Sequence, residues 1–138
     1  MANHILVIED SLLVQRLVAV CLRELGRRVV SALDGPSGIH EACSDPPGVV
    51  ILDIGLPGID GWEVLRRMRA DSRCSSVPVL VLTAHAQEEY RLEADRQGAE
   101  AFLTKPFEPD VLRGTVARLL QITGDPLEVA PCPSSSGA

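Results

Sequence analysis

The chain has 138 residues and a formal net charge of −6, and 46% of its residues are hydrophobic. That hydrophobic content excludes a disordered chain, and the length suits one domain with a single core. The acidic balance, without any lysine and arginine run, argues against direct binding of nucleic acid. No apolar run approaches the roughly 18–20 residues of a membrane span, and the first residues lack the pattern of a secretory signal. We therefore expect a cytoplasmic domain.

The cysteines are scattered and form no CxxC pair: Cys21, Cys43, Cys74 and Cys132. This spacing argues against a zinc site and is typical of reduced thiols that pack or lie at the surface. Two histidines, His4 and His40, are also expected at the surface.

The first elements alternate between buried strand and amphipathic helix. Residues 4–8 form an apolar run that predicts a strand. A helix follows and ends at Gly26, and its expected buried stripe is Leu13, Leu17, Val20 and Cys21. Residues 29–31 predict a short strand, and Gly35-Pro36 opens a helix that continues to about residue 43.

The alternation continues through the central part of the chain. Residues 48–53 predict a strand that is apolar on both faces. Asp60 is expected to cap the next helix, with Glu63 at the reciprocal position of a capping box. Residues 78–82 predict the fourth strand.

The last elements complete the pattern. A charged helix with few residues to bury is expected over 86–97, stopped by Gly98, and a fifth strand over 101–104. Pro109 opens a final helix, and its predicted buried stripe is Leu112, Val116, Leu119 and Leu120. Residues 124–138 have the proline, serine and glycine composition of a tail or linker. We expect one domain over 1–123.

Five short buried strands separated by helices predict an α/β fold with a doubly wound parallel sheet. Sites in such folds form outside the carboxyl ends of the strands. The polar residues expected at those ends are Glu9, Asp10, Asp53, Thr83 and Lys105.

The chemistry of these five residues suits a phosphoryl group beside a divalent cation. Clustered carboxylates repel one another unless a cation lies among them, and oxygen ligands favour Mg²⁺ over zinc. Lys105 and the Thr83 hydroxyl can bind phosphoryl oxygens, and a carboxylate can be the nucleophile. Asp53 ends the central strand and is the best-placed acceptor.

The motifs together resemble the response-regulator receiver family of two-component signalling: Glu9-Asp10, the segment 53–61, Thr83-Ala84 and Lys105-Pro106-Phe107. The resemblance covers about residues 4–122. It implies a flavodoxin-like (βα)5 sandwich with strand order 2-1-3-4-5. It also implies a phosphoacceptor signalling domain that takes part in its own phosphotransfer and dephosphorylation, rather than an enzyme with a separate substrate.

The resemblance further implies roles for single residues. Asp53 accepts the phosphoryl group, and Glu9, Asp10, Asp53 and the backbone carbonyl of Gly55 hold Mg²⁺, with Mn²⁺ as a substitute. Thr83, Ala84 and Lys105 bind the phosphoryl group, and a cis peptide joins Lys105 to Pro106. Thr83 and Phe102 form the switch pair. Gly55 and His85 flank the mouth of the pocket.

The partners implied are a sensor histidine kinase or a histidine phosphotransfer protein as donor. An output domain or protein is expected on the face made by the fourth helix, fifth strand and fifth helix, and a homodimer is the alternative. The output itself is open: the chain can be a stand-alone regulator, a relay intermediate or a piece of a larger protein.

Three other functions compete with this interpretation. A phosphatase of the haloacid-dehalogenase type needs a second aspartate two residues after the nucleophile, where this chain has Gly55. A flavodoxin-like cofactor binder needs a phosphate-cradling loop after the first strand, which is absent here. A receiver-like module without phosphorylation usually lacks the acidic pair, the acceptor or the lysine, and this sequence has all of them.

Overall fold

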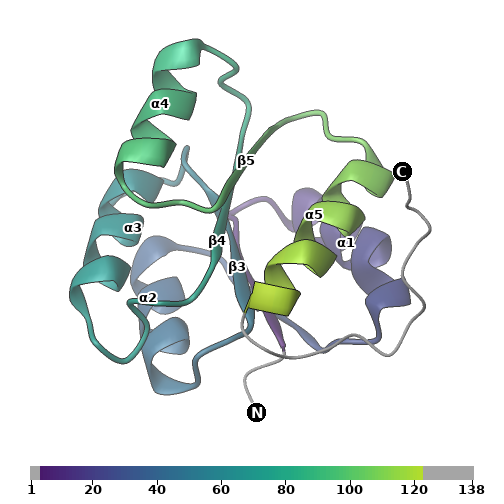
Figure 1. The fold of residues 1–138 in the computed structure, drawn as a ribbon, viewed down its shortest axis with the longest axis horizontal. Coiled ribbons are helices and arrows are strands. Elements are labelled where there is room, and N and C mark those ends of the chain that lie inside the picture. Colours follow the sequence, from purple (N-terminus) through teal and green to yellow (C-terminus); the bar gives the residue numbers. More distant parts are fainter. Residues whose placement is uncertain (1–3, 123–138) are drawn as a thin grey trace.

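The computed structural model describes residues 4–122, so the expected tail at 124–138 lies outside the described residues. In that part of the chain five strands alternate with helices (Figure 1). The strands are β1 (Ile5–Ile8), β2 (Val29–Ala32), β3 (Val49–Asp53), β4 (Val79–Thr83) and β5 (Ala101–Thr104). The helices are α1 (Leu12–Leu22), the short 3₁₀ helix η1 (Arg23–Leu25), α2 (Gly35–Ser44), α3 (Gly61–Ala70), α4 (Glu88–Arg96) and α5 (Pro109–Ile122).

All strand pairs are parallel, and the sheet order is β2-β1-β3-β4-β5. This confirms the predicted flavodoxin-like α/β fold. Helices α2, α3 and α4 cover one face of the sheet, and α1 and α5 cover the other (Figure 1). No helix within residues 4–122 combines the length and apolar character needed to cross a membrane.

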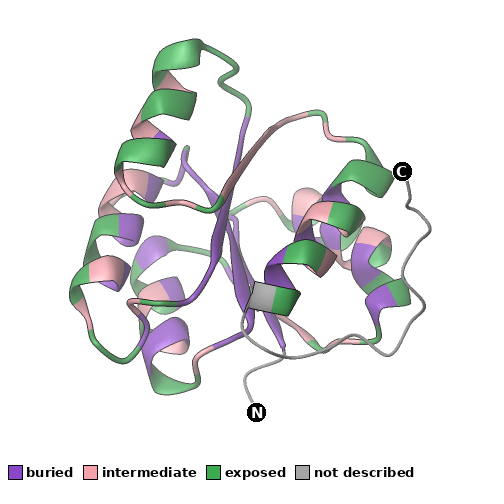
Figure 2. Cartoon of the chain, in the orientation of Figure 1, coloured by how far each residue is buried: buried purple, intermediate pink, exposed green. Residues whose placement is uncertain are grey.

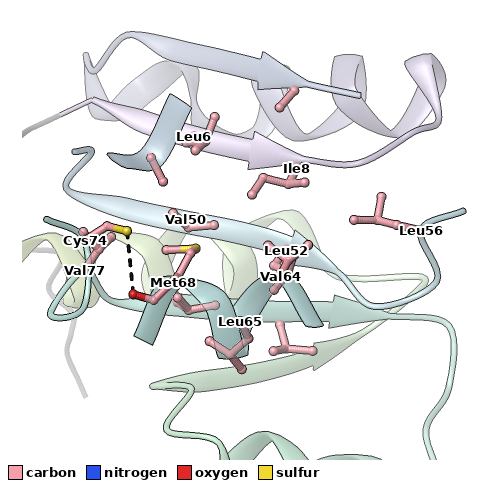
Figure 3. Close-up of a cluster of buried hydrophobic side chains, with 14 of the residues drawn as sticks. Leu6, Ile8, Val50, Leu52, Leu56, Val64, Leu65, Met68, Cys74 and Val77 are labelled. Carbon is pink, nitrogen blue, oxygen red and sulfur yellow. Dashed lines mark hydrogen bonds between the residues drawn. The ribbon is translucent and has the colours of Figure 1, made fainter. Parts of the chain in front are cut away.

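Alternation along the strands divides the core into two layers. Leu6 and Ile8 point into one buried cluster, whereas Ile5 and Val7 point into the other. The first cluster includes Leu52, Leu65 and Met68 (Figure 3). The second receives the α5 stripe, whose four predicted members are all fully buried: Leu112, Val116, Leu119 and Leu120.

Helix boundaries follow local chemistry. The side chain of Asp60 accepts a hydrogen bond from the Glu63 backbone N–H at 3.0 Å, which confirms the predicted cap of α3. The reciprocal half of the capping box was wrong, because the Glu63 carboxylate accepts from Arg66 and Arg67 instead. Gly26 and Gly98 adopt positive φ angles of 68° and 85° where the preceding helices end.

The predicted buried stripe of α1 was wrong. Leu13, Leu17 and Val20 are exposed, and Cys21 is half-buried; the helix instead buries Gln15, Val18 and Leu22. Gln15 explains why α1 buries a different face from the predicted one. Its Nε2 lies 3.0 Å from the carbonyl oxygens of Val7 and Glu9 and 3.1 Å from that of Ala32. These bonds hold the carboxyl ends of β1 and β2 together and fix which face of α1 meets the sheet.

His4 was also predicted incorrectly, because it is buried next to the start of β1, whereas His40 is exposed as expected. The prediction that the charged fourth helix has few residues to bury is confirmed. Among the nine residues of α4, which the structure describes in full, Ala94 is the buried one (Figure 2).

Candidate functional site

The register of the sheet brings the predicted polar residues to one edge. Ile8 pairs with Leu52, so Glu9 and Asp10 follow β1 directly beside Asp53 at the end of β3. Thr83 ends β4 and pairs with Thr104 of β5, so Lys105 follows at the same level. The sheet topology therefore assembles one polar site from four strand ends that are far apart in the sequence.

Three carboxylates form the centre of this site. Glu9, Asp10 and Asp53 each place an oxygen within 4.8 Å of the others. Glu9 and Asp53 are buried, with 3% and 7% of their surface exposed, whereas Asp10 is exposed. Asp53 Oδ1 accepts the Gly55 backbone N–H at 3.0 Å, which orients the carboxylate. The cluster combines concentrated negative charge with an open side.

Lys105 supplies the compensating positive charge. Its Nζ lies 2.8 Å from Glu9 Oε1 and 3.6 Å from Asp53 Oδ2. The Lys105–Pro106 peptide bond is cis, as expected. The lysine thus bridges two of the three carboxylates across the site.

The electrostatic state of Glu9 reflects this setting. Burial raises the pKa of Glu9 above its usual value of 4.5, and the neighbouring Asp53 carboxylate raises it further. Hydrogen bonds from Lys105 and from the Ser11 backbone N–H lower the pKa of Glu9, but burial is the larger effect. The charged form of Glu9 is therefore costly without a further cation.

Thr83 and Lys105 tie β4 to β5 at the rim of the site. Thr83 is fully buried, its Oγ1 accepts the His85 backbone N–H at 3.1 Å, and its carbonyl oxygen accepts the Lys105 backbone N–H at 2.7 Å. Ala84 and His85 are exposed beside it. The hydroxyl thus lies at the base of the loop that leads into α4.

Phe102 lies apart from this group, on the outer strand β5. It is half-buried, pairs in register with Val81 rather than with Thr83, and lines a shallow pocket between α4 and β5. The other lining residues include Arg91, Ala94 and Asp95. A pocket on this side leaves space next to the ring.

His85 makes an aromatic contact that the sequence did not predict. The His85 ring stacks on Tyr90 of α4, with ring centroids 4.7 Å apart and an interplanar angle of 9°, and Tyr90 lies 6.4 Å from Trp62 of α3. The interval of five residues from His85 to Tyr90 crosses a loop and the first helical turn. Such a contact has no helical or strand periodicity by which a sequence could reveal it.

The donor set fits a hard divalent cation. Its three groups are carboxylates, which supply the oxygen ligands that Mg²⁺ prefers, and the exposed Asp10 leaves room for retained water. The raised pKa of Glu9 indicates that added positive charge would stabilise the cluster. Sulfur and imidazole ligands are not among these three groups, which disfavours zinc.

Fold and site together define a class: a doubly wound α/β domain with a carboxylate cluster and a lysine at the carboxyl edge of its parallel sheet. Residues 5–117 match the family model described as the response regulator receiver domain. The chain belongs to this family and is a two-component response regulator receiver domain.

Individual relatives agree with the family assignment. The chain is 37% identical to the DNA-binding dual master transcriptional regulator RpaA of Synechocystis, over 87% of this chain and 50% of the relative. It is 33% identical to protein PilH of Pseudomonas aeruginosa, over 85% of this chain and 97% of the relative. The chain therefore spans about half the length of RpaA and nearly all of PilH.

One similar solved structure contains a metal ion. The receiver domain of sensor histidine kinase PA1611 from Pseudomonas aeruginosa, which carries a magnesium ion in its active-site cleft, is 30% identical to this chain. The match has a TM-score of 0.79 and covers 88% of this chain and 99% of that domain.

Proposed function

We propose that Asp53 accepts a phosphoryl group from a phosphohistidine of a sensor histidine kinase or histidine phosphotransfer protein. The observation that carries this proposal is the cluster of Glu9, Asp10 and Asp53 within 4.8 Å, with Lys105 at 2.8 Å from Glu9. One Asp53 oxygen forms a bond to phosphorus while the bond from phosphorus to the donor imidazole breaks. The electron pair of that bond returns to the imidazole nitrogen.

Mg²⁺ is the proposed cofactor, with Mn²⁺ as a substitute, and its holders are Glu9, Asp10, Asp53 and the Gly55 carbonyl. When bound, the ion neutralises charge on the phosphoryl oxygens. Lys105 is well placed to move its charge from Glu9 to a phosphoryl oxygen, because it already lies 3.6 Å from Asp53. The Thr83 hydroxyl and the Ala84 backbone N–H are the proposed neutral donors.

The conformational change caused by phosphorylation passes from the site to α4 through the loop that follows Thr83. The Thr83 hydroxyl moves toward the phosphoryl group and gives up the His85 N–H at 3.1 Å, and Phe102 turns inward from its half-buried position. The face formed by α4, β5 and α5 then binds an output domain or protein, or a second copy of the chain. Water later hydrolyses the acyl phosphate, so the domain takes part in its own dephosphorylation.

The test is phosphorylation by phosphoramidate or acetyl phosphate with Mg²⁺, followed by intact-mass measurement at neutral pH. Wild type and the matched control Asp45→Asn, an exposed aspartate outside the site, should gain one phosphoryl mass. Asp53→Asn should lose at least about 90% of that labelling because the nucleophile is gone. EDTA or Asp10→Ala should have a similar effect.

Two results contradict separate parts of the proposal. Full labelling of Asp53→Asn contradicts the assignment of the acceptor. Undiminished labelling of wild type in EDTA contradicts the role of the metal and leaves the acceptor in place.

A further inference from the structure

Two cysteines that are distant in the sequence meet at the opposite edge of the sheet from the acceptor. Cys43 lies in the last turn of α2, and Cys74 lies in the turn between α3 and β4. Their Sγ atoms are 2.7 Å apart. Both side chains are buried, with 6% and 1% of their surface exposed. The fold thus holds two free thiols in direct contact across a gap of 31 positions.

We propose that Cys43 and Cys74 are a site of oxidative modification and form an intramolecular disulfide by exchange with a low-molecular-weight disulfide such as oxidised glutathione. A disulfide requires a sulfur separation of about 2.05 Å. The two sulfur atoms therefore need to approach by less than 1 Å. The folded chain supplies this proximity, so the second, intramolecular step has a high effective concentration.

The surroundings of the pair favour a disulfide over a bound metal. Asp71 also reaches both sulfur atoms, with its nearest oxygen within 4.8 Å of each. Two thiolates on one tetrahedral zinc ion, however, lie about 3.8 Å apart, given zinc–sulfur bonds of about 2.3 Å. Asp71 is moreover engaged by Arg73, whose guanidinium lies 2.9 Å from its carboxylate. The observed sulfur contact is too short for shared zinc ligation.

Cys74 is the more deeply buried partner. Figure 3 shows it beside Met68 and Val77, and its thiol donates to the Met68 carbonyl oxygen at 3.7 Å. Burial raises the pKa of Cys74 to about 12, so its thiolate is scarce at neutral pH. Cys43 is slightly more exposed, and we therefore assign it the first, attacking role.

The reaction balances in two exchange steps. The Cys43 thiolate attacks the small disulfide, forming a mixed disulfide and releasing one small thiol. Cys74 then gives up its proton and attacks the Cys43 sulfur, which releases the second small thiol. Two protein thiols are oxidised by two electrons, and one small disulfide is reduced to two thiols. The raised pKa of Cys74 makes the second step slow until the 71–77 turn opens locally.

The bond would staple α2 to the turn after α3. The closed loop contains β3 and Asp53, but the staple lies at the amino edge of the sheet and the acceptor at the carboxyl edge. We therefore expect a more stable domain whose phosphorylation is unchanged. Bond formation does not depend on the proposed role of Asp53.

The experiment uses the full chain carrying Cys21→Ser and Cys132→Ser, so that the two remaining thiols are Cys43 and Cys74. The protein is equilibrated in glutathione buffers of rising oxidised fraction, starting both from native chain and from chain refolded out of urea. It is then acid-quenched, denatured and alkylated. We expect loss of two hydrogens, no alkyl groups, and a peptide that links Cys43 to Cys74.

Matched controls add Cys43→Ser or Cys74→Ser to the same chain. Neither should form an intramolecular bond; each should keep one alkylatable thiol or carry one glutathione. The linked form should have a Tm higher by about 10 °C, as a loop of this length predicts.

Three outcomes overturn the proposal. Two alkylatable thiols after refolding in the most oxidising buffer show that the folded pair does not close. Two glutathione adducts show that the cysteines react separately. A Tm below that of the reduced chain shows that the native fold does not accommodate the bond.

Discussion

The central strands and the β5 side of the sheet differ in how deeply their residues are buried. Every residue of β1, β3 and β4 is buried, whereas all four residues of β5 are half-buried (Figure 2). Helix α4, which packs on β5, buries Ala94 and leaves Leu92 48% exposed. We call strands β1, β3 and β4 the firm part of the domain, and β5 with α4 the loose part. Asp53 and Glu9 extend from the firm part, and Phe102 belongs to the loose part.

This difference matches two different physical tasks. Phosphoryl transfer needs an acceptor and charged neighbours at fixed distances, which densely packed strands provide. A surface that responds to phosphorylation must move at low cost, and few buried contacts make that cost small. Thr83 joins the two parts, because it is fully buried in β4 and yet accepts a hydrogen bond from the loop that leads into α4.

The comparison is tested most strongly by matched leucine truncations. Leu52→Ala in β3 should reduce the free energy of unfolding by about 2–5 kcal/mol, because it leaves a cavity in a fully buried layer. Leu92→Ala in α4 should change it by less than about 0.5 kcal/mol. Urea denaturation with similar m-values would measure both. Equal losses would show that α4 is held as firmly as the central strands.

The second prediction concerns the residue that joins the two parts. Thr83→Ala should still be phosphorylated, because the acceptor and the carboxylates remain. Its phosphorylation-dependent amide shifts over residues 86–102 should fall to less than about half of the wild-type size, since the hydroxyl no longer couples the site to the loop. Thr83→Ser, which keeps a hydroxyl, is the control. Shifts of full size in Thr83→Ala would refute this route.

The buried carboxylate of Glu9 is expected to lower the stability of the folded chain at neutral pH. Burial is the largest effect on Glu9 and raises its pKa, so the folded chain binds the Glu9 proton more tightly than the unfolded chain does. The contribution of Glu9 is most favourable below about pH 4.5, the unfolded value, and becomes less favourable as pH rises through the raised pKa. Glu9→Gln should therefore raise the Tm by a few degrees at pH 7 in EDTA.

The pH series provides the control for that variant. The Tm difference between Glu9→Gln and wild type should shrink toward zero as pH falls well below 4.5, where Glu9 is protonated in both states. Adding Mg²⁺ should stabilise wild type more than the variant. A variant that is less stable at pH 7 would show that the ion pair with Lys105 outweighs burial.

The fold was predictable because its strands are short apolar runs and its helices have distinct stops. The face of α1 was not, because that helix is apolar on most sides and periodicity could not choose between Leu17 and Val18. The choice depends on Gln15, whose partners lie on β1 and β2. His4 was misplaced because a polar residue directly before a strand gives no sign in the sequence of being buried. Nor could the spacing of Cys43 and Cys74 reveal their contact, which depends on how α2 packs beside α3.

The carboxyl-edge residues were predictable for a different reason. Parallel strands align their carboxyl ends, so Glu9, Asp53 and Lys105 had to meet once the strands were identified. What the sequence could not give is the pairing within the cluster, such as the preference of Lys105 for Glu9 at 2.8 Å over Asp53 at 3.6 Å. Those distances depend on side-chain packing rather than on strand order.

The smallest effects are expected at Gly55, whose backbone N–H donates to Asp53, and at His85, whose backbone N–H donates to Thr83. We propose that these two residues flank the mouth of the site. In the proposed hydrolysis, water passes these two residues to attack phosphorus in line, opposite Asp53. A Cβ added at Gly55 would meet Asp53 Oδ1 at 3.7 Å, an ordinary contact. A Cβ is therefore accepted at this position, and we expect a long side chain on it to obstruct the approach of water.

Gly55→Met should accordingly slow decay of the acyl phosphate by about threefold or more, because the side chain shields phosphorus from water. His85→Ala removes the ring that stacks on Tyr90 at 4.7 Å and loosens the opposite side of the mouth, so its decay rate should also change by more than about twofold. Decay of phosphorylated protein after removal of the phosphodonor measures both rates, with Gly55→Ala as the small-side-chain control. Rates within about twofold of wild type for Gly55→Met and His85→Ala would show that the mouth does not set the lifetime. Faster decay in Gly55→Met would refute the steric argument itself, because a shield that accelerates hydrolysis must act on the attacking water rather than exclude it.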